Sequence, residues 1–119
     1  MQPQGPASVS MHARRRAGGL IGKVLDTGPV GYLSVVGRTV SWTAGGTLRW
    51  SVDAGQVAVL RRPSTVQYDL VLGVSGEEWR FIVDVGPVNT FTRGLIIAAR
   101  RRDAALTMVR LIEEAKRVA

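Results

Sequence analysis

The feature that most constrains the fold is a succession of short segments in which apolar and polar side chains alternate, with turn residues between one segment and the next. The segments TVSWTA (39–44) and TLRWSV (47–52) both follow this pattern. Gly45 and Gly46 lie between them and can adopt the positive φ angles that a tight hairpin turn requires. Because successive residues of a strand face opposite sides of a sheet, the pattern predicts a mainly β domain with antiparallel hairpins.

The same reasoning predicts about seven antiparallel strands along the chain. They comprise residues 20–25, 31–36, 39–44, 47–52, 56–62, 65–74 and 78–85. In the most regular of them, residues 65–74, Val66 and Tyr68 open a run of inward apolar positions. All three tryptophans also fall on inward positions, whereas Asp69 and Asp84 fall on outward ones. We therefore expect a small curved sheet or barrel filled by a few large side chains.

From Asp103 onward, the spacing of the apolar residues is that of an amphipathic helix. The apolar arc comprises Ala104, Ala105, Met108, Leu111, Ile112 and Ala115, and charged residues lie opposite. When the helix is extended backward, Arg101 falls inside this arc, and the run of residues before Arg100 is apolar on all sides. Either the secondary structure or the burial of the chain must therefore change near the arginine triplet Arg100, Arg101 and Arg102.

Three arrangements of this region are compatible with the sequence. One helix can end near Arg100 while a second begins at Asp103, whose carboxylate would cap free N–H groups. Alternatively, one long helix extends beyond the core. The methylene groups of Arg101 would then lie on the apolar surface, and its guanidinium group would reach water. In the third arrangement, FTRGLIIAA (91–99) forms a last strand. We prefer a continuous or kinked helix over about residues 89–118.

The N-terminal residues 1–19 are rich in Gln, Pro, Ser and Gly, a composition typical of disordered segments. We expect a basic tail there, carrying Arg14, Arg15 and Arg16, followed by one domain over residues 20–119, since about 100 residues can bury a single core. The net charge is +7, but acidic residues are interspersed with the basic ones in the domain. The chain has no cysteine and no apolar run near the roughly 18 residues that cross a bilayer. We expect a cytoplasmic protein, with peripheral attachment to a membrane as the alternative.

The order of elements, about seven antiparallel strands and then one amphipathic helix, resembles the bacterial pleckstrin-homology-like (PH/GRAM-type) domain family. The segments that carry the resemblance are GYLSVVGRTVSWTAGGTLRWSVDAGQVAVLRR, YDLVLGVSGEEWRFIVDV and DAALTMVRLIEEA. The resemblance implies a bent antiparallel barrel in which the helix closes one open end. Met108, Leu111 and Ile112 would then be buried against the tryptophan-rich interior, each contributing about 1.5 to 3 kcal/mol. We therefore expect the helix to be required for folding.

The resemblance also bears on function. Lipid-binding members of the family concentrate Lys and Arg around the loop that joins their first two strands, but the candidate loops here offer only Lys23 or Arg38. The family is also widely used for protein contacts and oligomerisation. We therefore expect a non-enzymatic interaction module that binds a protein partner or itself, as a homo-oligomer or as a structural component of an assembly. Exposed strand edges and the outer face of the helix are the expected surfaces.

The alternative function is binding to a polyanion, either nucleic acid or the lipids of an anionic membrane. The candidate residues for this or for a partner are Arg14, Arg15, Arg16, Arg61, Arg62, Arg100, Arg101 and Arg102. Arginine guanidinium groups bind phosphates and carboxylates well. However, Arg61 and Arg62 are neighbours on one predicted strand and point to opposite faces. The triplet at 100–102 is more typical of a solvated joint at the edge of the core than of a binding patch.

Other chemistry finds little support in the sequence. His12, in the predicted tail, is more typical of an incidental polar residue than of a general base. The carboxylates are expected on the solvated surface; they include Asp53, Asp69, Glu77, Glu78 and Asp84. The chain shows neither metal-ligand spacing nor a Gly-rich phosphate loop followed by a helix. We therefore predict no catalytic residue, no metal site, no cofactor and no small-molecule substrate.

Overall fold

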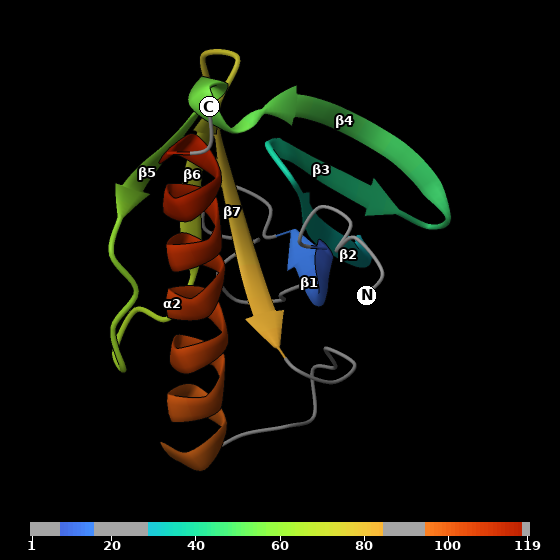
Figure 1. The fold of residues 1–119 in the computed structure, drawn as a ribbon. Helices are drawn as coiled ribbons and strands as arrows, with labels where there is room; N and C mark the ends of the chain where they lie inside the picture. The colour runs from blue at the N-terminus through green and yellow to red at the C-terminus, as the bar shows by residue number, and fades with distance from the viewer. Residues whose placement is uncertain (1–7, 16–28, 85–94, 118–119) are drawn as a thin grey trace, which may run out of the picture.

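The fold of the described residues is a single curled sheet with one long helix against it. The computed structural model describes residues 8–15, 29–84 and 95–117. Seven antiparallel strands follow the order β4-β3-β2-β1-β7-β6-β5, and the sheet curls into a half-barrel (Figure 1). The elements are β1 (Ser8–Arg15), β2 (Val30–Val36), β3 (Thr39–Ala44), β4 (Thr47–Asp53), η1 (Ala54–Gln56), β5 (Val57–Arg61), β6 (Leu70–Val74), β7 (Glu77–Asp84) and α2 (Leu95–Arg117). The predicted mainly β class with a capping C-terminal helix is confirmed.

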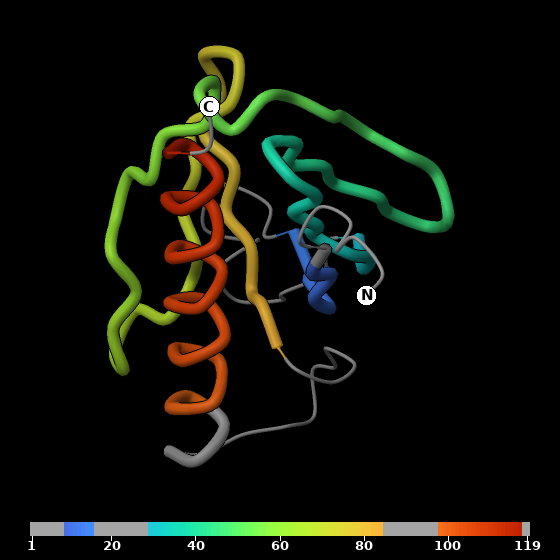
Figure 2. The backbone as a smooth tube through the Cα atoms, in the orientation of Figure 1, coloured from blue at the N-terminus to red at the C-terminus, as the bar shows by residue number. Residues whose placement is uncertain are grey.

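The helix α2 closes the hollow of the sheet. It packs mainly against β7 and also contacts η1, β2 and β6. Met108 and Ile112, from the predicted apolar arc, are both fully buried, while Leu111 is only partly buried against the core. The backbone trace in Figure 2 shows β7 running along the inner side of the helix. The apolar arc predicted from Asp103 onward is therefore the face that packs on the sheet.

The aromatic side chains fill the space between the two halves of the sheet. Trp42 from β3 is 1% exposed, and its ring centroid lies 4.8 Å from that of Phe81 on β7. Trp50 from β4 and Trp79 from β7 are half-buried against the core, with ring centroids 5.7 Å apart. The prediction that all three tryptophans point inward is confirmed, and β3, β4 and β7 meet through these rings.

The strand predictions are accurate where the alternation is bounded by turns. β3 has the predicted bounds, and Gly45 and Gly46 have φ angles of 58° and 77°, as their turn requires. By contrast, β6 begins only at residue 70, and Val66 is 90% exposed rather than inward. Residues 64–67 instead form a turn, in which the Ser64 N–H donates to the Gln67 carbonyl over 2.9 Å. Local hydrogen bonding there overrides the alternating pattern.

The largest correction concerns the N-terminus. The prediction that residues 1–19 form a tail is wrong for Ser8–Arg15, which form β1. This strand pairs with β2 on one side and β7 on the other, so it lies in the middle of the sheet. Met11 and Ala13 alternate there with Ser10 and His12, and Ala13 is fully buried. The Gln- and Pro-rich composition of the surrounding residues masked this short period-two pattern.

Two other sequence predictions need comment. The strand predicted at residues 20–25 lies outside the described residues, as does the start of the helix before Leu95. From Leu95 the helix is continuous through the arginine triplet, so a strand at residues 91–99 is wrong for residues 95–99, and no second helix begins at Asp103.

Candidate functional site

The sheet has two ends, and the strand at each end has one unpaired edge. The terminal strands are β4 and β5, each hydrogen-bonded to a neighbour on one side only. A groove of about 590 Å³ lies along one face of α2, and its one described lining residue outside the helix is Arg62, which directly follows β5. Exposed strand edges were among the surfaces expected to bind a partner, so this groove is the candidate site.

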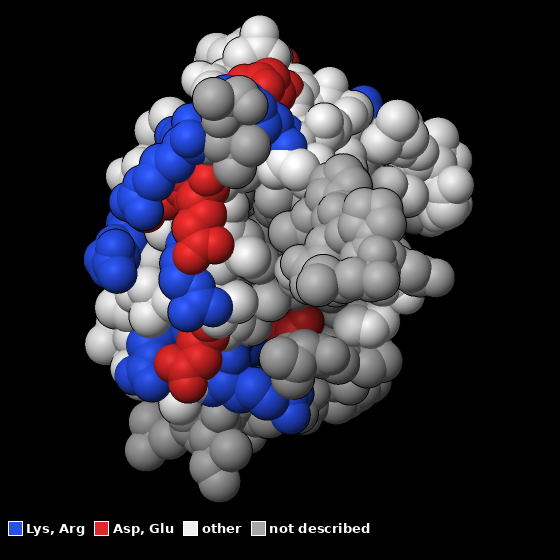
Figure 3. All heavy atoms as spheres, in the orientation of Figure 1, with Lys and Arg blue, Asp and Glu red and all other residues white. Residues whose placement is uncertain are grey.

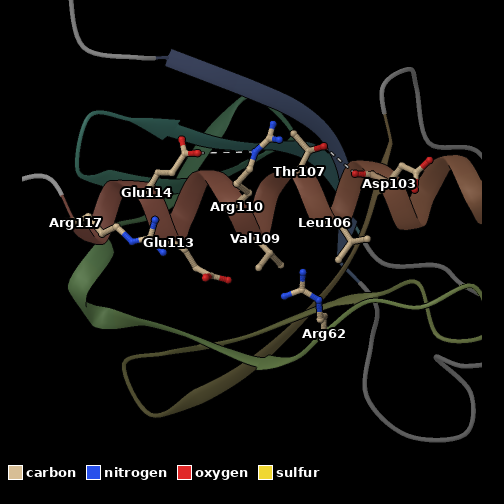
Figure 4. Close-up of a pocket in the computed structure, with 9 residues that line it drawn as sticks. All are labelled: Arg62, Asp103, Leu106, Thr107, Val109, Arg110, Glu113, Glu114 and Arg117. Carbon is tan, nitrogen blue, oxygen red and sulfur yellow. Dashed lines mark hydrogen bonds and ion pairs between the residues drawn. The ribbon is translucent and has the colours of Figure 1, made fainter.

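The groove is built from one face of the helix and the end of β5 (Figure 4). Its lining comprises Arg62, Asp103, Leu106, Thr107, Val109, Arg110, Glu113, Glu114 and Arg117. Most of these helix residues recur at intervals of three and four, which places them on one face of α2. Figure 4 shows Arg62 projecting from the segment that directly follows β5 toward Leu106 and Val109. The groove thus has an apolar floor between rims of charged side chains.

The charged rim contains both signs. Arg110 lies 4.0 Å from Glu114, measured from Nε to Oε1, and both side chains are well exposed. Figure 3 shows the same mixture over the helix face, where acidic and basic side chains adjoin one another. A surface of this kind favours specificity and register in a contact more than attraction to a uniformly charged polymer.

The arginine triplet is bound to carboxylates. Arg100 forms a bidentate pair with Asp84 at the end of β7, with Nε–Oδ1 and Nη2–Oδ2 distances of 2.7 and 2.9 Å. This pair raises the pKa of the Arg100 guanidinium, mainly through the hydrogen bond and then through the negative charge of Asp84. Arg101 approaches the same carboxylate, with 3.4 Å between Nε and Oδ2. Two arginines of α2 therefore hold the end of β7.

This geometry corrects two predictions. Asp84 has no exposed surface, so its expected place on the solvated surface is wrong. Arg101 is only 3% exposed, so it does not reach water as the long-helix interpretation supposed. Alternation along β7 directs Asp84 to the face opposite Val83, as predicted. The carboxylate is buried because α2 lies against the end of the strand and Arg100 and Arg101 contact it there.

Arg61 and Arg102 also have acidic partners. Arg102 donates to Asp103 over 2.9 and 3.0 Å and to the Thr65 hydroxyl over 2.8 Å. Arg61 lies 3.7 Å from Asp69, which is 7% exposed and not on the solvated surface as expected. Arg61 and the triplet at 100–102 thus face carboxylates.

The other candidate arginines are dispersed. Arg15 lies on β1 with its Cζ 3.8 Å from the centre of the Trp79 ring, a cation–π contact. Arg14 lies opposite Ile82 of β7, and Arg16 falls outside the described residues. Arg62 is exposed and lines the groove.

One functional-looking arginine is structural, and the sequence did not reveal its role. Arg38, in the turn between β2 and β3, donates to both carboxylate oxygens of Asp53 over 3.0 and 3.1 Å. Its Nη1 also donates to the carbonyls of Ala115 and Lys116, at the C-terminal end of α2, over 3.1 and 3.0 Å. The hydrogen bonds from Arg38 and from the Gly55 N–H lower the pKa of the Asp53 carboxyl. Arg38 thus ties the sheet to the helix end rather than offering a free cation.

The sequence also raised His12 and the carboxylates as candidates for other chemistry. His12 is part of β1 rather than of a tail, and its ring lies 4.8 Å from that of Tyr32. Within residues 8–15, 29–84 and 95–117, no three histidine or carboxylate side chains gather closely enough to hold a metal ion.

Comparison with known proteins identifies no relative: no family model, curated protein or solved structure matches the chain. The resemblance to the pleckstrin-homology-like family therefore stays a prediction. The described part of the chain also contains no helix with the length and apolar character needed to cross a bilayer.

Proposed function

We propose that the protein is a non-enzymatic interaction module that binds an extended segment of a partner protein in the groove between β5 and α2. The observation that carries this proposal is the groove on α2, whose one described lining residue outside the helix, Arg62, directly follows β5, a terminal strand of the sheet with one unpaired edge. An unpaired edge presents backbone N–H and C=O groups to which another strand can add.

The floor of the groove determines which segments fit. An added strand directs alternate side chains to opposite faces. One set would therefore enter the groove and cover Leu106, which is only half-buried, beside Val109, which is 2% exposed and already packed in the core. The other set would face solvent beside Leu60, which is 52% exposed on β5. The expected ligand has apolar residues at every second position.

The rim supplies the selectivity. Arg62 stands on the β5 side, and the helix side carries Arg110 and Arg117 together with Glu113 and Glu114. Because both signs are present, a partner with its own charges in the matching order binds in one register and one direction. A uniformly acidic polymer would face Glu113 and Glu114 as well as the arginines.

The test is selection of binding peptides from a displayed random library, followed by affinity measurement with the purified full chain. We expect enriched peptides with alternating apolar residues. Leu106→Glu should weaken their binding by at least about tenfold, the equivalent of losing one buried apolar contact. Val36→Glu is the matched control, because Val36 is 42% exposed on β2, away from the groove. This variant should bind as the wild type does.

Two outcomes would count against the proposal. One is a library that yields no binder while the chain unfolds cooperatively and is therefore folded. The other is a set of binders whose affinity falls equally in Leu106→Glu and Val36→Glu, which would place the contact outside the groove.

A further inference from the structure

We infer that the opposite end of the sheet is a self-association surface, on which β4 pairs antiparallel with β4 of a second copy of this chain. This inference goes beyond the proposed function and uses different residues. Figure 2 shows the β3–β4 hairpin reaching away from α2, so that the outer edge of β4 is not beside the helix as β5 is. A two-fold axis would join the two sheets into one continuous sheet.

The burial of β4 differs from that of its neighbour. Val40 and Trp42 on β3 are 0% and 1% exposed. Their partners across the ladder, Val52 and Trp50, face the same side of the sheet but are only half-buried. The apolar side of β4 is thus left partly uncovered at the sheet edge, and a further strand alongside would cover it.

The sequence of β4 is compatible with pairing to itself. With the two-fold axis at Ser51, each serine faces its own copy, and Arg49 of one chain comes opposite Asp53 of the other. These two opposite charges would meet twice, once on each side of the axis. The same register places Trp50 opposite Val52, an aromatic and β-branched pair that favours strand association. Arg49 is exposed, and the Asp53 carboxylate, although it accepts hydrogen bonds from Arg38 and the Gly55 N–H, keeps 48% of its side-chain surface exposed.

The surrounding surface allows two positively charged molecules to approach. The whole chain has a net charge of +7, yet β4 carries one basic and one acidic residue. On β2, two strands inward from β4, the exposed side chains include Val30, Tyr32 and Val36, which are 40%, 46% and 42% exposed. A contact centred on β4 therefore joins the two copies through a part of their surface that has little net charge.

The first experiment measures molar mass by light scattering over a wide range of protein concentration. We expect the wild type to form a concentration-dependent dimer. Ser51→Lys should abolish it, because two ammonium groups would then oppose each other at the axis. Ala58→Lys is the control: it adds the same charge to an exposed position on β5, the terminal strand at the opposite end of the sheet, and should leave the dimer intact.

The second experiment tests the register by cross-linking, which is straightforward because the chain has no cysteine. Residues directly opposite in an antiparallel pair have Cα atoms about 4.5 to 5.5 Å apart, within the range that a disulfide spans. Ser51→Cys should therefore yield a disulfide-linked dimer on mild oxidation. Ser41→Cys, opposite Ser51 on β3, lies one strand further from the axis and should not cross-link.

The inference is overturned by a wild type that stays monomeric at every concentration, or by a dimer that Ser51→Lys leaves unchanged. It is also overturned by a dimer that Leu106→Glu abolishes and Ser51→Lys does not, since the copies would then meet in the groove. Failure of peptide binding at the groove with a normal β4 dimer would contradict only the proposed function.

Discussion

At the scale of single residues, Asp84 is the most consequential buried charge in the described structure. Its carboxylate has no exposed surface and contacts both Arg100 and Arg101. Removing a carboxylate from water costs several kcal/mol, which only opposite charge and well-formed hydrogen bonds offset. The pair therefore stabilises the fold only as a complete unit, and it fixes the first turns of α2 against the end of β7.

Replacement of Asp84 by asparagine tests this role. An amide cannot supply the negative charge that offsets the burial of Arg101, so Asp84→Asn should lower the free energy of unfolding by about 3 to 5 kcal/mol. Asp103→Asn is the control, because the Asp103 side chain is 66% exposed. It should change stability by no more than about 0.5 kcal/mol. Urea denaturation of both variants decides the matter, and equal effects would contradict the assigned role.

The Arg38–Asp53 pair gives a pH-dependent prediction. The folded state lowers the pKa of Asp53 below its ordinary value, so the pair stabilises the protein above that value and the contribution is lost as the pH falls through the folded pKa. In Arg38→Gln we expect the Asp53 pKa, followed by carboxyl-carbon NMR, to rise toward its ordinary value. Arg38→Lys, which keeps the charge but not the bidentate geometry, should give an intermediate pKa.

The stability difference between wild type and Arg38→Gln should accordingly be larger at neutral pH and narrow in acid. It should not vanish, because the hydrogen bonds from Arg38 to the carbonyls of Ala115 and Lys116 do not titrate. An Asp53 pKa that is the same in wild type and variant would contradict this account.

At the scale of elements, a strand or turn was predicted accurately where residues close together in the chain determine it. β3 and its glycine turn are specified by residues close together in the chain, and their bounds were predicted correctly. The burial of Asp84 was not predictable, since alternation along β7 carries no information about where α2 ends up. The sequence predicted that strand edges and the outer helix face are the binding surfaces, but it did not predict the groove beside β5. The distance between two elements is set by packing across the whole domain.

The strand β1 makes the clearest element-scale prediction. It pairs with β2 and β7 and so joins the two halves of the sheet. A chain lacking residues 1–15 should therefore lose cooperative unfolding and aggregate, because it exposes the strand edges on both sides. A chain lacking only residues 1–7 keeps β1 and should melt cooperatively. Circular dichroism during heating separates the two, and a cooperative transition in the shorter chain would refute the central role of β1.

At the scale of the whole molecule, the positive charge is distributed rather than concentrated. Asp69, Asp84 and Asp103 each lie against one or two arginines of the candidate clusters. Arg15 lies over the Trp79 ring. The arginine clusters were visible in the sequence, but the sequence could not show that Asp84, on β7, would fold against Arg100 and Arg101. Net charge alone therefore overstates the attraction of the described surface for a polyanion.

The salt dependence of DNA binding makes this argument quantitative. If all the candidate arginines released counterions from duplex DNA, the logarithm of the affinity would fall with the logarithm of salt at a slope of about 0.9 for each phosphate neutralised. Because Arg61, Arg100, Arg101 and Arg102 already face carboxylates, we expect a slope no more than about half of that total. Fluorescence anisotropy of a labelled duplex over a series of salt concentrations measures it, and anionic vesicles provide a parallel readout. A slope close to the value expected for all the candidate arginines would mean that the ion pairs open on binding. This result would favour polyanion binding over the protein-binding groove.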